Sequence, residues 1–106
     1  KVSSAALQKF FSMSTDLDDS KESKCFMLCA MQAWGGMKDD GTLDLDHSKT
    51  YIDRAFVGTA DKVMASMRMC KDKEPKGDDL CHYAYAYSKC FNEELKRQNI
   101  PLPQRQ

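Results

Sequence analysis

The sequence predicts an all-α fold of about five amphipathic helices joined by disulfides. Apolar residues recur three and four positions apart along most of the chain, as they do on one face of a helix. Val, Ile and Thr, which favour strands, are few and scattered. Five cysteines occur in 106 residues. This content is typical of a small secreted domain in which disulfides supplement a limited core, although a cytosolic chain with five free thiols remains the alternative.

The first predicted helix is short and begins near the N-terminus. Leu7, Phe10 and Phe11 fall on one of its faces. Ser3 or Ser4 can cap it, because a serine hydroxyl accepts a hydrogen bond from a free N–H of the first turn.

A polar connector, residues 16–23, leads to the second predicted helix. Gly35 and Gly36 loosen the end of this helix, and a polar turn around Asp40 and Gly41 follows. Its apolar stripe comprises Cys25, Phe26, Cys29, Ala30, Ala33, Trp34 and Met37.

Two further helices are predicted in the middle of the chain. Ile52 and Phe56 lie four positions apart on a short third helix, which Gly58 ends. Thr59 can cap the fourth helix. The apolar residues of that helix are Ala60, Val63, Met64, Met67 and Cys70.

The final predicted helix is the longest, and Asp78 or Asp79 can cap it. Pro101 and Pro103 keep the tail, residues 99–106, out of helix. Amphipathic helices of this length are not stable alone, so the five are expected to form a single domain. The apolar side of the last helix comprises Leu80, Ala84, Tyr87, Phe91 and Leu95.

Charge and hydropathy exclude several classes of function. Lys and Arg number 16, as do Asp and Glu, so there is no basic surplus of the kind that nucleic acids and anionic membranes attract. The longest apolar run, Cys25 to Met31, is too short to span a bilayer. Because no catalytic arrangement or cofactor motif stands out, we expect neither an enzyme nor a bound cofactor or metal.

The spacing of the cysteines is the most specific pattern in the chain. Three residues separate Cys25 from Cys29, forty separate Cys29 from Cys70, ten separate Cys70 from Cys81, and eight separate Cys81 from Cys90. The first gap places two thiols one turn apart on the same helix face, where they meet different neighbouring helices.

These gaps match those between the second and sixth cysteines of the insect odorant-binding (pheromone-binding) family, which the chain resembles over about residues 2–95. The supporting segments are Lys24–Cys29, Asp39–Leu43 and Lys89–Phe91. The resemblance implies a helical cage around an apolar cavity, with extracellular binding and transport of an odorant, pheromone, fatty acid or other lipid.

The resemblance also implies a disulfide pairing, Cys25–Cys81 and Cys70–Cys90. The family's first cysteine would stand just before Lys1, so we expect the single domain of residues 1–106 to lack the family's N-terminal helix. Cys29 is then unpaired. The chain is shortened or processed, or is a natural short form, or forms a dimer through Cys29. Besides a second copy of the chain, a receptor is the other candidate protein partner.

Large apolar side chains are the candidate ligand contacts, although each also fits an ordinary core position. Tyr83, Tyr87, Gln32 and Ser66 could add polar groups to a mostly apolar pocket. Ile100 and Leu102 in the tail either fold back as a lid or fray. The ligand-binding candidates are Phe10, Phe11, Phe26, Met31, Trp34, Phe56, Met64, Met67, Tyr83, Tyr87 and Phe91.

Two alternatives use the same residues differently. Cys25, Cys29, Cys81 and His82 could supply a zinc site, but they form only one of the two closely spaced ligand pairs that structural zinc sites use. A secreted, salivary-type interaction protein that sequesters host mediators or inhibits a host protein is the main functional alternative on the same fold. A filled core would favour it, whereas an internal cavity favours the carrier.

Overall fold

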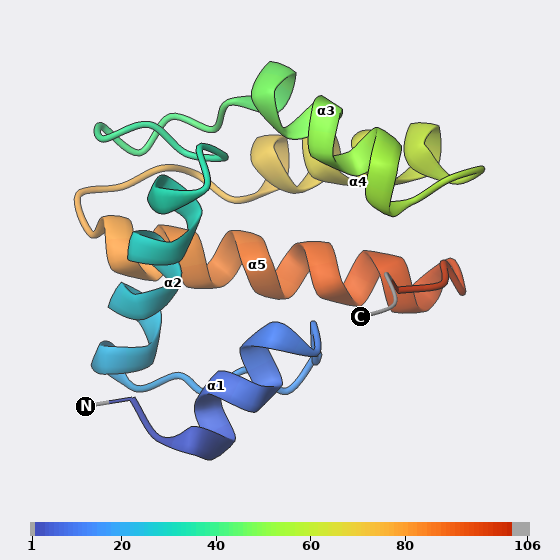
Figure 1. The fold of residues 1–106 in the computed structure, drawn as a ribbon. Coiled ribbons are helices and arrows are strands. Elements are labelled where there is room, and N and C mark those ends of the chain that lie inside the picture. The colour runs from blue at the N-terminus through green and yellow to red at the C-terminus, as the bar shows by residue number, and fades with distance from the viewer. Residues whose placement is uncertain (1, 103–106) are drawn as a thin grey trace.

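The computed structural model describes residues 2–102, which fold into five α-helices without a β-sheet (Figure 1). The predicted fold class is confirmed. The helices in chain order are α1 (Ser4–Phe11), α2 (Lys21–Ala33), α3 (Leu45–Ala55), α4 (Ala60–Lys73) and α5 (Leu80–Arg97).

The helix α5 runs through the middle of the molecule and organises the other four (Figure 1). Both α2 and α4 pack directly on α5, while α3 packs on α4 and α1 packs on α2. Within the described chain, neither α1 nor α3 brings a Cα atom within 8 Å of α5. The space between α5 and these two helices is therefore wider than close helix packing would leave.

Two disulfides fix the helices that touch α5. Cys25–Cys81 joins α2 to α5 with its Cα atoms 4.5 Å apart, and Cys70–Cys90 joins α4 to α5 with its Cα atoms 5.8 Å apart. These are the two pairs that the family resemblance implies. Both flank α5, so the central helix is covalently attached to each of its direct neighbours.

Side chains cap helices at two of the three predicted positions. The side chains of Ser3 and Asp79 accept the N–H three residues later, at 3.1 Å in each case, and so cap α1 and α5. The predicted cap at Thr59 is wrong. Its hydroxyl donates back to the Phe56 carbonyl at 3.4 Å and leaves the first turn of α4 without a side-chain cap.

The region between α2 and α3 differs most from the prediction. The helix α2 ends at Ala33, and Gly35 then adopts a left-handed conformation with φ of +88°. A Cβ atom there would lie 2.6 Å from the His47 ring, which hydrogen-bonds the Trp34 carbonyl oxygen at 3.0 Å. Met37, predicted on the helical stripe, instead pairs with Leu43 in an isolated β-bridge.

The end of the chain leaves the helix as expected but does not fray at once. After Asn99, at φ +55°, Ile100 turns back and donates its N–H to the Leu95 carbonyl at 3.0 Å. Ile100 is 6% exposed and packs in the core. The remainder of the predicted tail, residues 103–106, lies outside the described residues.

Candidate functional site

An apolar cavity of about 660 Å³ lies among the helices. Pockets for small molecules typically have volumes of about 300–1,000 Å³ and mostly apolar walls. All five helices, or the residues directly after them, contribute side chains. The lining residues are Phe10, Phe11, Met13, Ala30, Met31, Ala33, Trp34, Tyr51, Ile52, Phe56, Met67, Tyr87, Ser88, Phe91 and Asn92.

Aromatic contacts hold α1 over this space instead of against α5. The Phe10 and Phe11 rings of α1 meet the Phe26 ring of α2 edge to face, with ring centroids 5.4 and 6.2 Å apart. Such pairs contribute about 0.5–1.5 kcal/mol beyond the area that they bury. These contacts fix α1 on α2 and leave a gap toward α5.

Half-exposed aromatic side chains mark where the cavity meets solvent. Phe11 is 51% exposed, Trp34 42% and Tyr51 53%, and all three line the cavity. The Trp34 and Tyr51 ring centroids lie 5.7 Å apart. The cavity thus opens beside the ends of α1 and α2 and the surface of α3, where an apolar molecule could enter.

Most of the polar lining groups come from α5. Ser88 Oγ donates a hydrogen bond to the Met31 sulfur at 3.6 Å, and Asn92 Nδ2 donates to the Ser14 carbonyl at 3.0 Å. The Tyr87 hydroxyl is buried without a hydrogen-bond partner among the described residues. Burial raises the pKa of this hydroxyl well above its usual range.

Replacing Tyr87 by phenylalanine should raise the free energy of unfolding. An unsatisfied buried hydroxyl costs about 1–3 kcal/mol, and Tyr87→Phe removes it while keeping the ring that stacks on Phe91. Urea denaturation measures the change. Tyr85→Phe, on a half-buried position of the same helix, is the control and should change stability little. A larger loss of stability for Tyr87→Phe than for Tyr85→Phe would show that the Tyr87 hydroxyl has a partner.

Most of the aromatic and methionine residues singled out from the sequence meet at this cavity. Three do not. Phe26 packs against the α1 rings from outside the lining, whereas Met64 and Tyr83 lie in the buried core. The candidates in the lining are Phe10, Phe11, Met31, Trp34, Phe56, Met67, Tyr87 and Phe91.

Two of the polar candidates face other parts of the molecule. Gln32 Nε2 donates to the carbonyls of Lys38 and Asp39, at 3.2 and 3.4 Å, and so supports the turn after α2. The Ser66 hydroxyl accepts from Gln98 at 2.7 Å and lies outside the lining. Neither contributes a polar group to the cavity.

Several lining residues were missed by the sequence analysis. Ser88 and Asn92 lie one turn apart and directly follow Tyr87 and Phe91, so helical spacing alone could have suggested them. Tyr51 precedes a residue already placed on the apolar face of α3. The missed residues are Met13, Ala30, Ala33, Tyr51, Ile52, Ser88 and Asn92.

A second hollow of about 590 Å³ adjoins the apolar cavity near the C-terminal end of α5. The two hollows share Met13 and Asn92 in their walls. Met13 holds a left-handed conformation at φ +57°, and the Asn92–Ser14 hydrogen bond fixes the same segment. This segment therefore forms a partition between the hollows.

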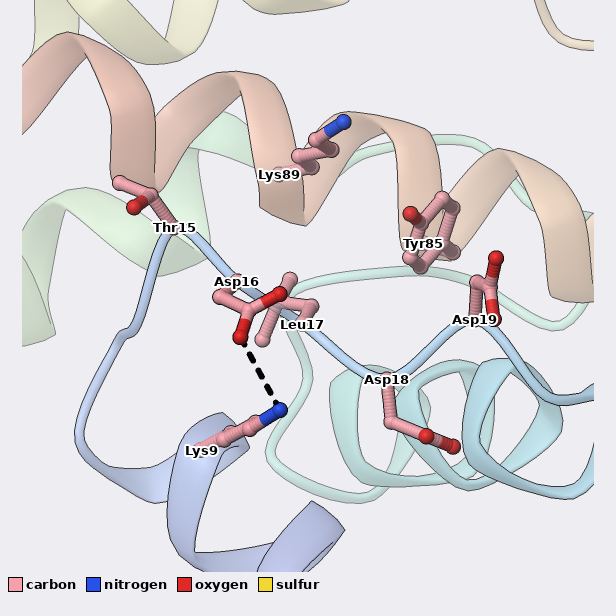
Figure 2. A pocket seen from close by; sticks show the side chains of 8 residues that line it. All are labelled: Lys9, Thr15, Asp16, Leu17, Asp18, Asp19, Tyr85 and Lys89. Carbon is pink, nitrogen blue, oxygen red and sulfur yellow. Dashed lines mark hydrogen bonds and ion pairs between the residues drawn. The ribbon is translucent and has the colours of Figure 1, made fainter.

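A third, smaller hollow of about 290 Å³ is polar and lies between residues 15–19 and α5 (Figure 2). Figure 2 shows Lys9 pointing toward Asp16, with which it forms an ion pair at 3.1 Å. Hydrogen bonds from the Ser20 and Ser23 hydroxyls lower the pKa of Asp18. Charged side chains of both signs line this hollow, so it does not suit an apolar molecule.

The cysteines do not form a metal site in the described structure. Cys25 and Cys81, two of the four ligands in the zinc alternative, are bonded to each other. No cluster of three or more His, Cys, Asp or Glu side chains suited to a metal ion occurs within residues 2–102. Cys29 is a free, exposed thiol on α2.

Thiol titration should therefore find one reactive group in the native protein. Cys29 is exposed while the other four cysteines are bonded, so Ellman's reagent is expected to report one thiol per chain with or without denaturant. Reduction in denaturant is the control and should reveal all five cysteines. If no thiol reacts before reduction, the result contradicts a free Cys29.

Comparisons with known proteins agree on one family. A family model described as the PBP/GOBP family matches residues 1–94. General odorant-binding protein 19d of Drosophila melanogaster is 29% identical over 93 residues, which are 85% of this chain. The match spans 61% of that relative's length, so the chain covers less than two thirds of it.

Two solved structures are similar in fold. Pheromone Binding Protein 3 of Epiphyas postvittana superposes with a TM-score of 0.74 at 16% identity, covering 92% of this chain and 84% of the other. The Drosophila melanogaster odorant-binding protein dmelOBP28a gives a TM-score of 0.72 at 22% identity, covering 94% and 83%. At these identities the likeness shows the shared helical fold.

Proposed function

This chain belongs to the PBP/GOBP family, and from that membership we propose that it is an extracellular carrier of one small apolar molecule. Odorant- and pheromone-binding proteins bind small hydrophobic ligands and are non-enzymatic carriers. The observation that carries the proposal for this chain is the cavity of about 660 Å³ with its aromatic and methionine walls. A filled interior would instead have favoured the alternative of a secreted inhibitor of host proteins.

The proposed ligand is bound mainly by removal of apolar surface from water. Each Å² of apolar surface buried contributes roughly 25 cal/mol. Met13, Met31 and Met67 have flexible, polarizable side chains that adapt to ligands of different shape. Trp34 and Tyr51 at the opening supply broad faces that first meet the ligand.

Disulfides support the extracellular part of the proposal. They persist in oxidising compartments, and two of them join α5 to its neighbours. Members of the family are secreted proteins. Within residues 2–102, no helix combines the length and the apolar character needed to cross a membrane.

Displacement of a fluorescent probe tests the proposal. N-phenyl-1-naphthylamine should bind saturably, at one site per chain, and apolar odorants of suitable size should displace it. Because Trp34 is the single tryptophan and lines the cavity, the same ligands should change its emission. Reduced, unfolded protein is the control and should bind no probe saturably. Failure of every member of a broad apolar library to displace the probe would contradict the carrier function.

A further inference from the structure

We propose that the cavity selects uncharged ligands bearing an acceptor oxygen, and that the Ser88 hydroxyl is the donor that holds this oxygen. The inference rests on the proposed function and specifies its ligand class. The ligands expected to bind are aldehydes, alcohols, ketones and esters, whereas fatty-acid anions are expected to bind weakly.

The first support is the charge of the lining. Among residues 2–102, no Lys, Arg, His, Asp or Glu side chain lines the apolar cavity. Lys9 and Lys89 line the separate polar hollow (Figure 2), and Lys96 lines the second hollow, whose wall shares Met13 and Asn92 with the cavity. The His47 ring is engaged with the Trp34 carbonyl oxygen at 3.0 Å. A carboxylate inside the cavity would therefore lose its hydration without gaining a cation, which is strongly unfavourable.

The second support is the placement of the polar groups on one wall. Ser88 and Asn92 lie one turn apart on α5, beside the Tyr87 and Phe91 rings. The walls from the other helices are apolar apart from the Tyr51 hydroxyl and the Trp34 indole N–H, both on half-exposed side chains at the opening. A ligand with one polar end is then oriented with that end toward α5 and its apolar part toward the other helices.

Ser88 is the group on this wall that is free to change partners. Its hydroxyl donates to the Met31 sulfur at 3.6 Å, and a thioether is a weak acceptor. A ligand oxygen is a better acceptor, and both Ser88 and Met31 line the cavity. Asn92 is already committed to the Ser14 carbonyl at 3.0 Å, and the Tyr87 hydroxyl, although it has no partner among the described residues, is not accessible to solvent.

Competition against N-phenyl-1-naphthylamine with four ligands of equal chain length tests the inference: decanal, decanol, decene and decanoate. At about pH 8, where the acid is ionised, decanoate should bind at least about tenfold more weakly than decanal. Ser88→Ala should lower the affinity for decanal and decanol by about two- to tenfold, which is the contribution of one neutral hydrogen bond. The same variant should leave decene, which has no oxygen, unchanged.

Two further variants make the test specific. Ser66→Ala removes a buried serine hydroxyl outside the cavity and should affect decanal and decene equally. Ala33→Arg adds a cation at an exposed lining position. It should raise the affinity for decanoate by about tenfold without raising the affinity for decanal. This variant and the comparison of ligands on the unmodified chain do not depend on how Ser88→Ala folds.

The outcomes separate the inference from the proposed function. Decanoate binding as tightly as decanal, or equal effects of Ser88→Ala on decanal and decene, would overturn the selection for uncharged acceptors and leave the carrier function standing. Failure of all four ligands to displace the probe would overturn both.

Discussion

Replacing both Cys25 and Cys81 by alanine is expected to lower the melting temperature by roughly 15–30 °C. The bond joins residues 56 apart in sequence, and closing a loop of that size stabilises a fold by about 4 kcal/mol in the loop-entropy model. In a domain of about 100 residues, each kcal/mol shifts the melting temperature by about 4–8 °C. Replacing both residues avoids leaving a second free thiol beside Cys29.

The melting temperature, followed by circular dichroism, measures this effect. Cys29→Ala is the matched control: it removes an exposed, unbonded cysteine and should change the melting temperature by only a few degrees. The loss also bears on the cavity, because Met31 and Trp34 lie on the α2 side of the bond and Ser88 lies on the α5 side. A double variant that melts like the Cys29→Ala control would show that helix packing alone holds α2 on α5.

Filling the cavity is expected to have the second largest effect. Ala30 is half-buried on α2 and lines the cavity. Ala30→Phe places a ring in the space proposed for the ligand, so probe affinity should fall by at least about tenfold, which corresponds to 1.4 kcal/mol. Because open space is available, the added ring should not produce the instability of about 1–3 kcal/mol that overpacking a filled core causes.

Ala65→Phe makes the same substitution at an exposed position of α4 that is outside the lining. Probe titration and thermal unfolding of both variants separate a blocked site from a damaged fold. Unchanged affinity in a folded Ala30→Phe protein would place the ligand somewhere other than this cavity.

Local patterns in the sequence were sufficient to predict the helices and several of their ends. Period-3.6 apolar spacing depends on each helix having one buried face, and all five helices have one. Ser3 and Asp79 cap helices because the N-cap interaction involves only neighbouring residues. The disulfide pairing has a different origin. It followed from the family resemblance, since spacing by itself leaves several connectivities open.

Tertiary contacts decided the features that the sequence could not predict. Met37 left the helical stripe because Gly35 turns the chain against His47. Ile100 packs in the core because the backbone reverses at Asn99. Each depends on a partner distant in sequence or on a local reversal that helical periodicity does not describe.

Membership of the cavity was only partly predictable for the same reason. Phe26 has an aromatic side chain, as expected of a ligand contact, but its ring packs against Phe10 of α1 and lies outside the cavity lining. Ser88 and Asn92 are polar, yet they line the cavity because α1 and α3 stand away from α5 at that level. Whether a side chain faces a cavity or the core depends on the distance between helices. The apolar periodicity of a single helix does not predict this distance.

Methyl NMR of protein labelled at its seven methionines tests the central claim most directly. Met13, Met31 and Met67 line the cavity, whereas Met27 and Met37 are buried elsewhere and Met69 is partly exposed. Titration with decanal should shift the first three methyl signals saturably, at one ligand per chain, and leave the other four, including that of Met64 in the buried core, nearly unchanged. Saturable shifts at Met27, Met37 or Met69 without shifts at the lining methionines would contradict binding in this cavity.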